Sequence, residues 1–400
     1  MSTSPPPGSP SSGSPASGSP SSGGPPCPAS PPPALAATYQ ALPGAQAGGY
    51  PAVSQVLAHH LASGFPAAVA QVVTPGGSPY AAAGGWARLP LPDATGAPGP
   101  AIAADLGTLF DLASLTKVVA TLPLVLLLHQ RGQWSIDDPI GRWLPGAPVS
   151  PVTISDCLLH ASGLLPHRPY YETCDSPAVI RRAVIAELAR ATPGEVSYSD
   201  LGFMLLGWAA ETCAGEPLAG LVGREVLGPL GMTTATYRPD APRERIAATE
   251  ADGDQRLVPG LAWGEVHDGN AFALGGISGH AGLFGTAADL ARYAAALLTP
   301  GQHPFLSPET IALMTARQAG GGDEPRTLGW RIRPDAWGDW PAGTIWHTGF
   351  TGTSLLICPP LRAAVVLLTN AVHPVRRPAE TAELRAGVHQ AVLDALRAGG

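Results

Sequence analysis

The sequence predicts an α+β fold in which one antiparallel sheet is built from both ends of the chain. Val- and Ala-rich runs that are typical of strands occur early in the chain and again near its end. The middle of the chain has the apolar spacing of helices. Strands at both ends with helices between them indicate a sheet with flanking helices and an inserted helical region. We expect a ligand cleft where the two regions meet.

The predicted strands come from the two ends of the chain. Near the start, Pro75, Gly76 and Gly77 separate two apolar runs, a pattern that predicts a β-hairpin of residues 65–74 and 80–87. Near the end we expect further strands at residues 327–333, 344–358 and 363–370, followed by a helix at residues 379–396. The helices predicted between these ends span residues 115–130, 176–190, 199–213, 218–226 and 287–298.

The first 44 residues form a separate segment that is rich in Ser, Pro and Gly. Such a segment has too little apolar surface to offset its ordering entropy, so residues 1–44 are predicted to be disordered. A single domain is expected over residues 45–400. No apolar stretch of the kind found in a secretory signal opens the chain, which predicts a cytoplasmic protein, although a misassigned start codon could hide an export signal.

Composition excludes several function classes. The net charge is −7 at neutral pH, which does not favour nucleic-acid binding. The longest apolar run, residues 118–128, is too short to span a bilayer and contains Pro123. No group of His and Cys has the spacing of zinc ligands. We therefore expect no nucleic-acid partner, no membrane span, no metal and no cofactor.

The first candidate for chemistry is Ser114-Leu115-Thr116-Lys117. On a helix, residues three apart share a face, so Lys117 could reach the Ser114 hydroxyl. A serine is a weak nucleophile until a neighbouring base takes its proton. Lysine can do this only when neutral, a state that burial and nearby positive charge favour. This spacing also occurs by chance, and Ser114 could simply cap a helix above a solvated Lys117.

Two further motifs lie downstream. Tyr198-Ser199-Asp200 stands at a predicted junction between a loop and a helix, where a phenol can relay protons. The alternative is that Ser199 or Asp200 is an N-cap and that Tyr198 only packs. His347-Thr348-Gly349 precedes an alternating apolar pattern that predicts a strand edge beside a substrate. The alternative for His347 is a strand histidine that faces solvent.

Together these motifs, in the order S-x-x-K, Y-S-D and H-T-G, resemble those of the serine β-lactamase-like superfamily. The resemblance is greatest to the class C β-lactamase-related group, which includes D-alanyl-D-alanine carboxypeptidases and esterases. Further similarity lies in TLFDLASLTK (108–117), LLHASGL (158–164), YSDLGFMLLG (198–207) and GEVHDGNAFALGGISGHAGLF (264–284). The resemblance extends over residues 52–396 and implies a β-lactamase/transpeptidase-like fold.

The resemblance also implies roles for individual residues. Ser114 would attack an acyl carbonyl and form an acyl-enzyme, with Lys117 helping to deprotonate it. Tyr198 would pass the proton to the leaving group and later help to activate water. His347 stands where many relatives have the lysine of K-T-G and would contact a substrate carboxylate or assist proton transfer. The backbone N–H groups of Ser114 and Phe350 would form the oxyanion hole.

Two departures from the family pattern affect the predicted substrate. Asp200 replaces the asparagine of Y-x-N and offers only acceptors. His347, which with Thr348 and Gly349 forms the predicted substrate-binding motif, offers a weaker and pH-dependent charge than lysine. Both departures weaken the case for efficient turnover of carboxylate-bearing β-lactams. His160 is expected to shape the loop under the site.

The predicted function is therefore a serine hydrolase acting on small esters or amides, among them peptides that contain D-amino acids. The alternatives are a D-alanyl-D-alanine carboxypeptidase, which would need export, a β-lactamase, and a non-catalytic penicillin-binding sensor. Ser114, Lys117 and Tyr198 all remain chemically competent, which argues against the sensor. The fold does not fix the substrate, because the cleft loops determine it.

Overall fold

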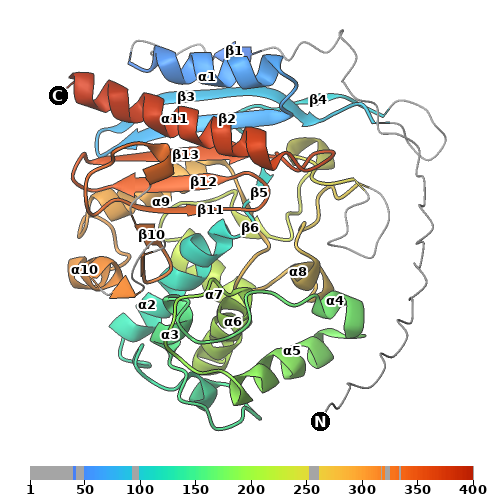
Figure 1. Ribbon diagram of the computed structural model, residues 1–400, viewed down its shortest axis with the longest axis vertical. Coiled ribbons are helices and arrows are strands. Elements are labelled where there is room, and N and C mark those ends of the chain that lie inside the picture. Colours follow the sequence, from blue (N-terminus) through green and yellow to red (C-terminus); the bar gives the residue numbers. More distant parts are fainter. Residues whose placement is uncertain are drawn as a thin grey trace, which may run out of the picture. The chain divides into compact units, whose positions relative to one another are not determined.

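Strands from both ends of the chain pair in one antiparallel sheet, as predicted. The structure, a computed structural model, describes residues 39–41, 49–91, 99–251, 261–316, 318–319, 325–332 and 335–399. Across the sheet the strands follow the order β1 (Tyr39–Ala41), β3 (Gly77–Arg88), β2 (Ala67–Thr74), β13 (Ala363–Thr369), β12 (Ser354–Cys358), β11 (Ile345–Thr348), β10 (Arg331–Ile332), β9 (Arg326–Thr327) and β8 (Gln318–Ala319). In Figure 1 the blue strand β2 therefore lies beside the orange strand β13.

The N-terminal hairpin is confirmed as β2 and β3, whereas two of the C-terminal strand predictions were wrong in detail. Residues 344–358 form a hairpin of β11 and β12 rather than one strand, because the chain turns at residues 349–353. Residues 327–332 do not form one strand either, because Gly329 has φ +74° and separates β9 from β10, and Arg333 lies outside the described residues. The prediction for residues 363–370 is confirmed by β13.

A short part of the segment predicted to be disordered pairs with the sheet. Residues 39–41 lie within the predicted segment 1–44, yet they form β1, which pairs with β3 in the register Tyr39 to Gly84. Residues 1–38 and 42–44 lie outside the described part of the chain.

The five helices predicted for the middle of the chain are all confirmed, and three of them include non-α turns. The helices are α1 (Pro51–Ala62), α2 (Leu122–Gln130), α3 (Ile154–Leu158), α4 (Tyr170–Thr173), α5 (Pro177–Ala186), α6 (Asp200–Ala214), α7 (Leu218–Val222), α8 (Gly269–Ala273), α9 (Ala287–Leu298), α10 (Pro308–Ala316) and α11 (Pro378–Gly399). The predicted helix 115–130 starts as a π-helical stretch, Lys117–Thr121, before α2. Similarly, α5 ends in a 3₁₀ turn, and α7 continues as a π-helical turn.

The large sheet is covered on both faces. Helices α1 and α11 lie side by side on one face, and α9 packs against β2, β13 and β12 on the other (Figure 1). Successive residues of a strand point to opposite faces, so β13 contributes to both apolar cores. Val366 belongs to the core that includes α9 and the central helices, and Val365 belongs to the core beneath α1 and α11.

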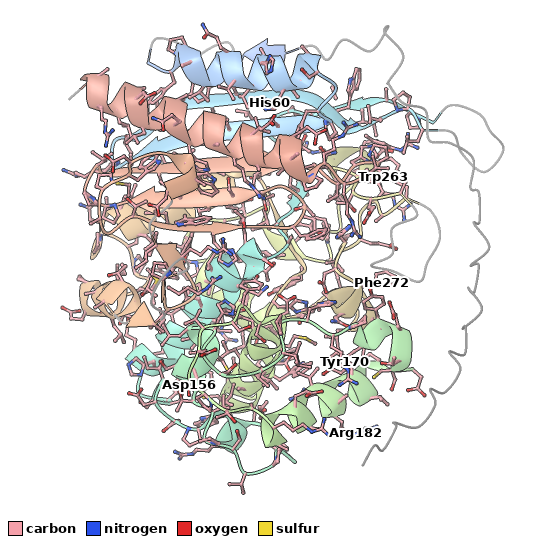
Figure 2. The ribbon with its side chains drawn as sticks, viewed as in Figure 1. His60, Asp156, Tyr170, Arg182, Trp263 and Phe272 are labelled. Atoms are coloured by element: carbon pink, nitrogen blue, oxygen red, sulfur yellow. The ribbon has the colours of Figure 1, made fainter. Side chains whose placement is uncertain are left out.

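A small three-stranded sheet connects the covered sheet to the central helices. It is formed by β5 (Phe110–Asp111), β7 (Leu283–Gly285) and β6 (Thr236–Tyr237). A small apolar cluster beside it includes Phe284, with the side chains of Trp263 and Phe272 packed against it; Figure 2 labels both of these. Strand β5 leads directly into Ser114. Among the described residues, no helix has both the length and the apolar character that a membrane span requires.

The close pairing of β3 with the start of β2 predicts a strict requirement for glycine at position 85. Gly85 has φ +85°, and an added Cβ would overlap the Pro66 carbonyl and lie 2.8 Å from the Ala67 Cα. We expect Gly85→Ala to lower the free energy of unfolding by roughly 1–3 kcal/mol, measured by urea denaturation. The matched control is Gly223→Ala, because Gly223 has helical dihedrals and open space around its Cα. Equal unfolding midpoints for Gly85→Ala and the wild type would contradict this expectation.

Candidate active site

Ser114 lies on a sharp turn between β5 and the helix that follows. Ala113 has φ +46°, an uncommon conformation for a residue with a Cβ. Its backbone N–H donates to Asp111 Oδ1 at 2.9 Å, and the Leu115 N–H donates to the Leu112 carbonyl at 3.0 Å. These bonds fix the turn, which presents the Ser114 side chain at the start of the helix.

Lys117 is fully buried and binds groups from three separate segments. Its Nζ donates to Ser114 Oγ at 2.9 Å and to the His280 carbonyl at 3.0 Å. It also forms an ion pair with Asp200 Oδ1 at 2.7 Å, and it lies 5.1 Å from the centroid of the Tyr198 ring. The spacing of three residues therefore brings Lys117 to Ser114, as the sequence predicted. Asp200 is the first residue of α6, which Ser199 caps by accepting from the Gly202 N–H.

The protonation state of Lys117 differs from the sequence-based expectation. Burial lowers its pKa, but the Asp200 carboxylate and the Tyr198 hydroxyl outweigh burial, so the pKa of Lys117 lies above its usual value. Burial also raises the pKa of Asp200, but attraction to Lys117 and a contact with His167 overcome it and hold that pKa below its usual range. The resting pair is therefore an ammonium and a carboxylate. The expectation of a neutral lysine omitted the acidic neighbour.

The His160 ring packs against the ring of Tyr198. The His160 Nδ1 accepts a hydrogen bond from the Ser199 N–H at 3.0 Å, and its ring centroid lies 4.5 Å from that of Tyr198. Burial, followed by the positive charges of Arg326 and Lys117, holds the pKa of His160 well below its usual value. A neutral, buried ring that packs against Tyr198 fits the expected role of shaping the site.

The H-T-G motif lies on β11 and in the turn after it. The His347 Nδ1 lies 2.8 Å from the Thr348 carbonyl, a contact that makes Nδ1 the protonated nitrogen. Burial, together with the charges of Lys117 and Arg326, lowers the pKa of His347 well below its usual value. His347 is therefore uncharged at neutral pH. The pH-dependent positive charge expected at this position is therefore displaced to lower pH, because the sequence does not reveal this burial.

Two backbone N–H groups of residues that line the pocket are candidates for binding a ligand. Among the described residues, neither the Ser114 N–H nor the Phe350 N–H donates to a protein acceptor. The Phe350 ring is stacked on His267 at 5.5 Å, with the Arg376 guanidinium 5.2 Å from its centroid. Glu250 binds both of these neighbours, at 2.8 Å to His267 Nε2 and 2.7 Å to Arg376 Nε. These contacts hold the exposed Phe350 ring at the rim of the site.

A pocket of about 540 Å³ contains most of the predicted site residues. Ser114 and Tyr198 line it together with residues 347–350, whereas Lys117 and Asp200 lie behind them. Four arginines also line this pocket: Arg331, Arg376, Arg377 and Arg385. Sequence reasoning missed them, although the cluster VRRP at residues 375–378 was a visible signal. A separate pocket of about 690 Å³ beside Arg238 and Phe272 includes none of the predicted site residues.

One cluster has the composition of a metal site. Ligand atoms of Asp200, Asp268 and His280 lie within 4.8 Å of one another. These atoms already have protein partners, because Asp200 binds Lys117 and His280 Nε2 lies 2.9 Å from Asp268 Oδ1. The second nitrogen of His280 lies 2.8 Å from Ser278 Oγ. A cation here would compete with the Lys117 ammonium, so the cluster acts as a charge network around Lys117.

Comparisons with known proteins show the family to which the chain belongs. A family model described as Beta-lactamase matches residues 53–390. The chain is 33% identical over 317 residues to a protein of Escherichia coli (strain K12) named "Putative D-alanyl-D-alanine carboxypeptidase", a match that covers 69% of this chain and 72% of that protein. It is 32% identical over 377 residues to the N-acetylmuramyl-L-alanine amidase of Bacillus subtilis (strain 168), with 82% of each covered.

The fold is also found among solved structures. The β-lactamase/D-alanine carboxypeptidase from Yersinia pestis, complexed with citrate, matches with a TM-score of 0.64 at 22% identity, covering 86% of this chain and 98% of that one. The family match spans most of the chain. The chain therefore belongs to the β-lactamase family and is a serine hydrolase.

Proposed function

We propose that this hydrolase forms an acyl-enzyme at Ser114 and cleaves small amides or esters that carry a carboxylate near the scissile bond. Peptides that end in a D-amino acid are the substrate class that we favour. The observation that carries the proposal is the set of four arginines that line the same pocket as Ser114. Relatives named as a carboxypeptidase and an amidase support an amide substrate.

The arginines give the pocket an excess of positive charge. Its described lining contains no Asp or Glu. Glu250 pairs with Arg376 from outside the pocket, and Glu380 lies 4.0 Å from Arg377. Guanidinium groups bind carboxylates with paired, charge-assisted hydrogen bonds. Recognition of a substrate carboxylate would therefore fall to arginines other than Arg385, which binds backbone carbonyls, rather than to the uncharged His347.

Acylation follows from the contacts of Ser114. In the neutral form of Lys117, Nζ accepts the proton as the Ser114 O–H bond breaks, and Oγ forms a bond to the acyl carbon. The carbonyl electron pair moves to oxygen, where the Ser114 and Phe350 N–H groups would receive the negative charge. Collapse of this intermediate breaks the bond to the leaving group, which takes the proton from Lys117 through Tyr198.

Deacylation repeats these steps with water. Tyr198 and Lys117 accept a proton from the water, whose oxygen attacks the acyl carbon, and Ser114 recovers its hydrogen when the acid departs. The net reaction consumes one water and needs no further reactant. A cytoplasmic location, which we also propose, would restrict these substrates to free peptides and cell-wall fragments.

Neutral ester hydrolysis is the second candidate. Asp200 in place of an amide and an uncharged His347 remove two groups that relatives can offer to a substrate carboxylate. The exposed Phe350 ring offers an apolar contact at the pocket rim. Rates on a neutral aryl ester and on a D-Ala-D-Ala peptide distinguish the two candidates.

Ser114 is expected to react covalently with a fluorophosphonate, because the Lys117 network activates its hydroxyl. Intact mass spectrometry should show one adduct on the wild type and none on Ser114→Ala. Ser176→Ala is the matched control, because Ser176 lies outside the pocket, and it should label fully. An unlabelled wild type, or a labelled Ser114→Ala variant, would overturn the assignment of the nucleophile.

Asp200→Asn is expected to move the acid limb of the profile of kcat/KM against pH to lower pH. Asp200 holds the pKa of Lys117 above its usual value, and only neutral Lys117 can accept the serine proton. Removing the carboxylate lowers that pKa, so the active form persists to lower pH. The measurement is a pH profile on a neutral aryl ester, with Asp339→Asn, at a residue whose side chain is 95% exposed, as the control. An acid limb that stays in place would exclude Lys117 as the titrating base.

Arg377→Gln is expected to lower kcat/KM for a D-Ala-D-Ala peptide by about tenfold, the equivalent of about 1.5 kcal/mol for a hydrogen bond to a charged group. The rate on a neutral aryl ester should not change, because that substrate lacks a carboxylate. Arg397→Gln, at a half-exposed arginine on α11 outside the pocket, is the control for lost charge. A parallel loss on both substrates would argue against carboxylate recognition by Arg377.

A further inference from the structure

The turn that carries Phe350 is tied to the segment that carries Ser114. The Gly349 N–H donates to the Thr353 carbonyl at 2.8 Å and closes the turn between β11 and β12. The Thr351 hydroxyl donates to the Asp111 carbonyl at 2.7 Å, and the Thr353 hydroxyl donates to the Leu112 carbonyl at 3.2 Å. The two N–H groups proposed for the oxyanion hole therefore belong to segments that are bonded to each other.

Arg385, on α11, binds this turn from the opposite side. Its Nη2 donates to the Gly349 carbonyl at 2.8 Å and to the Thr353 carbonyl at 2.9 Å. Its Nε donates to the Gly352 carbonyl at 3.2 Å. Three carbonyls of one five-residue turn thus converge on a single guanidinium. Among the described residues, no carboxylate lies within 4.0 Å of Arg385, so its charge is directed at the backbone.

The Gly349 carbonyl and the Phe350 N–H belong to the same peptide group, which is planar. A cation bound to that carbonyl fixes the orientation of the plane and so the direction of the N–H. It also polarises the peptide, which strengthens the N–H as a donor. Gly349 has no room to adjust, because an added Cβ would overlap Thr353 Oγ1 and lie 2.6 Å from the Leu112 carbonyl.

We infer that Arg385 is a positioning residue for the oxyanion hole, acting through the Gly349–Phe350 peptide rather than on the substrate. This inference rests on the proposed acyl-enzyme function. Arg385 holds and polarises the peptide whose N–H receives the negative charge of the tetrahedral intermediate. Since that charge develops only in the transition state, the contribution of Arg385 belongs to kcat rather than to KM.

A different role for Arg385 would be direct binding of a substrate carboxylate, because Arg385 also lines the pocket. The two roles differ on a neutral substrate. A carboxylate ligand matters only for anionic substrates, whereas an organised oxyanion hole matters for every acyl substrate. A thionoester adds a second distinction, because its sulfur develops the negative charge and is a weaker hydrogen-bond acceptor than oxygen.

The experiment compares wild type, Arg385→Gln, Arg385→Lys and Arg397→Gln on a neutral aryl ester and on the matching thionoester. Arg397 lies on the same helix and binds Asp339, away from the turn. We expect Arg385→Gln to lower kcat on the ester by roughly 10- to 100-fold, less than the loss of a complete oxyanion donor, with KM little changed. The preference for the ester over the thionoester should fall. Arg385→Lys should recover part of the rate, because it keeps the charge but not the fork of donors.

Each result decides the inference. A wild-type kcat on the neutral ester in Arg385→Gln would overturn it, as would a loss confined to carboxylate substrates. A lower kcat with an unchanged preference for the ester over the thionoester would also overturn it, because Arg385 would then only stabilise the fold. Urea unfolding reports on folding, and if Arg385→Gln does not fold, Arg385→Lys carries the same comparison. If the wild type itself shows no hydrolysis dependent on Ser114, the proposed function fails first and independently of Arg385.

Discussion

The site is organised around one buried ammonium group. Lys117 Nζ holds Ser114, the His280 carbonyl and Asp200 in one cluster, and these partners come from three distant parts of the sequence. A buried charge without partners costs several kcal/mol, so the loop at His280 and the start of α6 must both dock for the domain to be stable. The same contacts that satisfy the lysine also place it against the serine. Folding and assembly of the site are therefore one event.

The large sheet supplies the turn between β11 and β12, which lies beside the segment before Ser114. Pairing of β13 with β2 brings the C-terminal part of the chain across the N-terminal hairpin, and the β11–β12 turn then reaches the segment before Ser114. Helix α11 covers that sheet and extends Arg385 to the turn. Such contacts fix the direction of a backbone N–H on a short turn, because the peptide groups of an unsupported loop would vary in orientation.

The sequence allowed a sheet with strands from both chain ends, the helical insertion and the proximity of Ser114 and Lys117 to be predicted, because periodicity and motifs are local signals. It did not separate β11 from β12, since the apolar alternation continues through a turn defined by Gly352 at φ +110°. The charge states of Lys117 and His347 depend on burial and on neighbours distant in sequence, and a motif records neither. The arginines were missed for the same reason. Arg331 and Arg385 are distant in sequence and line the same pocket only in the folded chain.

The central position of β13 has a consequence for how the chain reaches its native state. Both faces of β13 are buried, and its neighbours, β2 and β12, begin near residues 67 and 354. During synthesis the N-terminal hairpin therefore exposes an unpaired edge until almost the whole chain has been made. Contacts this distant in sequence slow folding and leave strand edges open to other chains. A protein with this topology depends on its last strands for protection from aggregation, and its biosynthesis is most vulnerable while they are still on the ribosome.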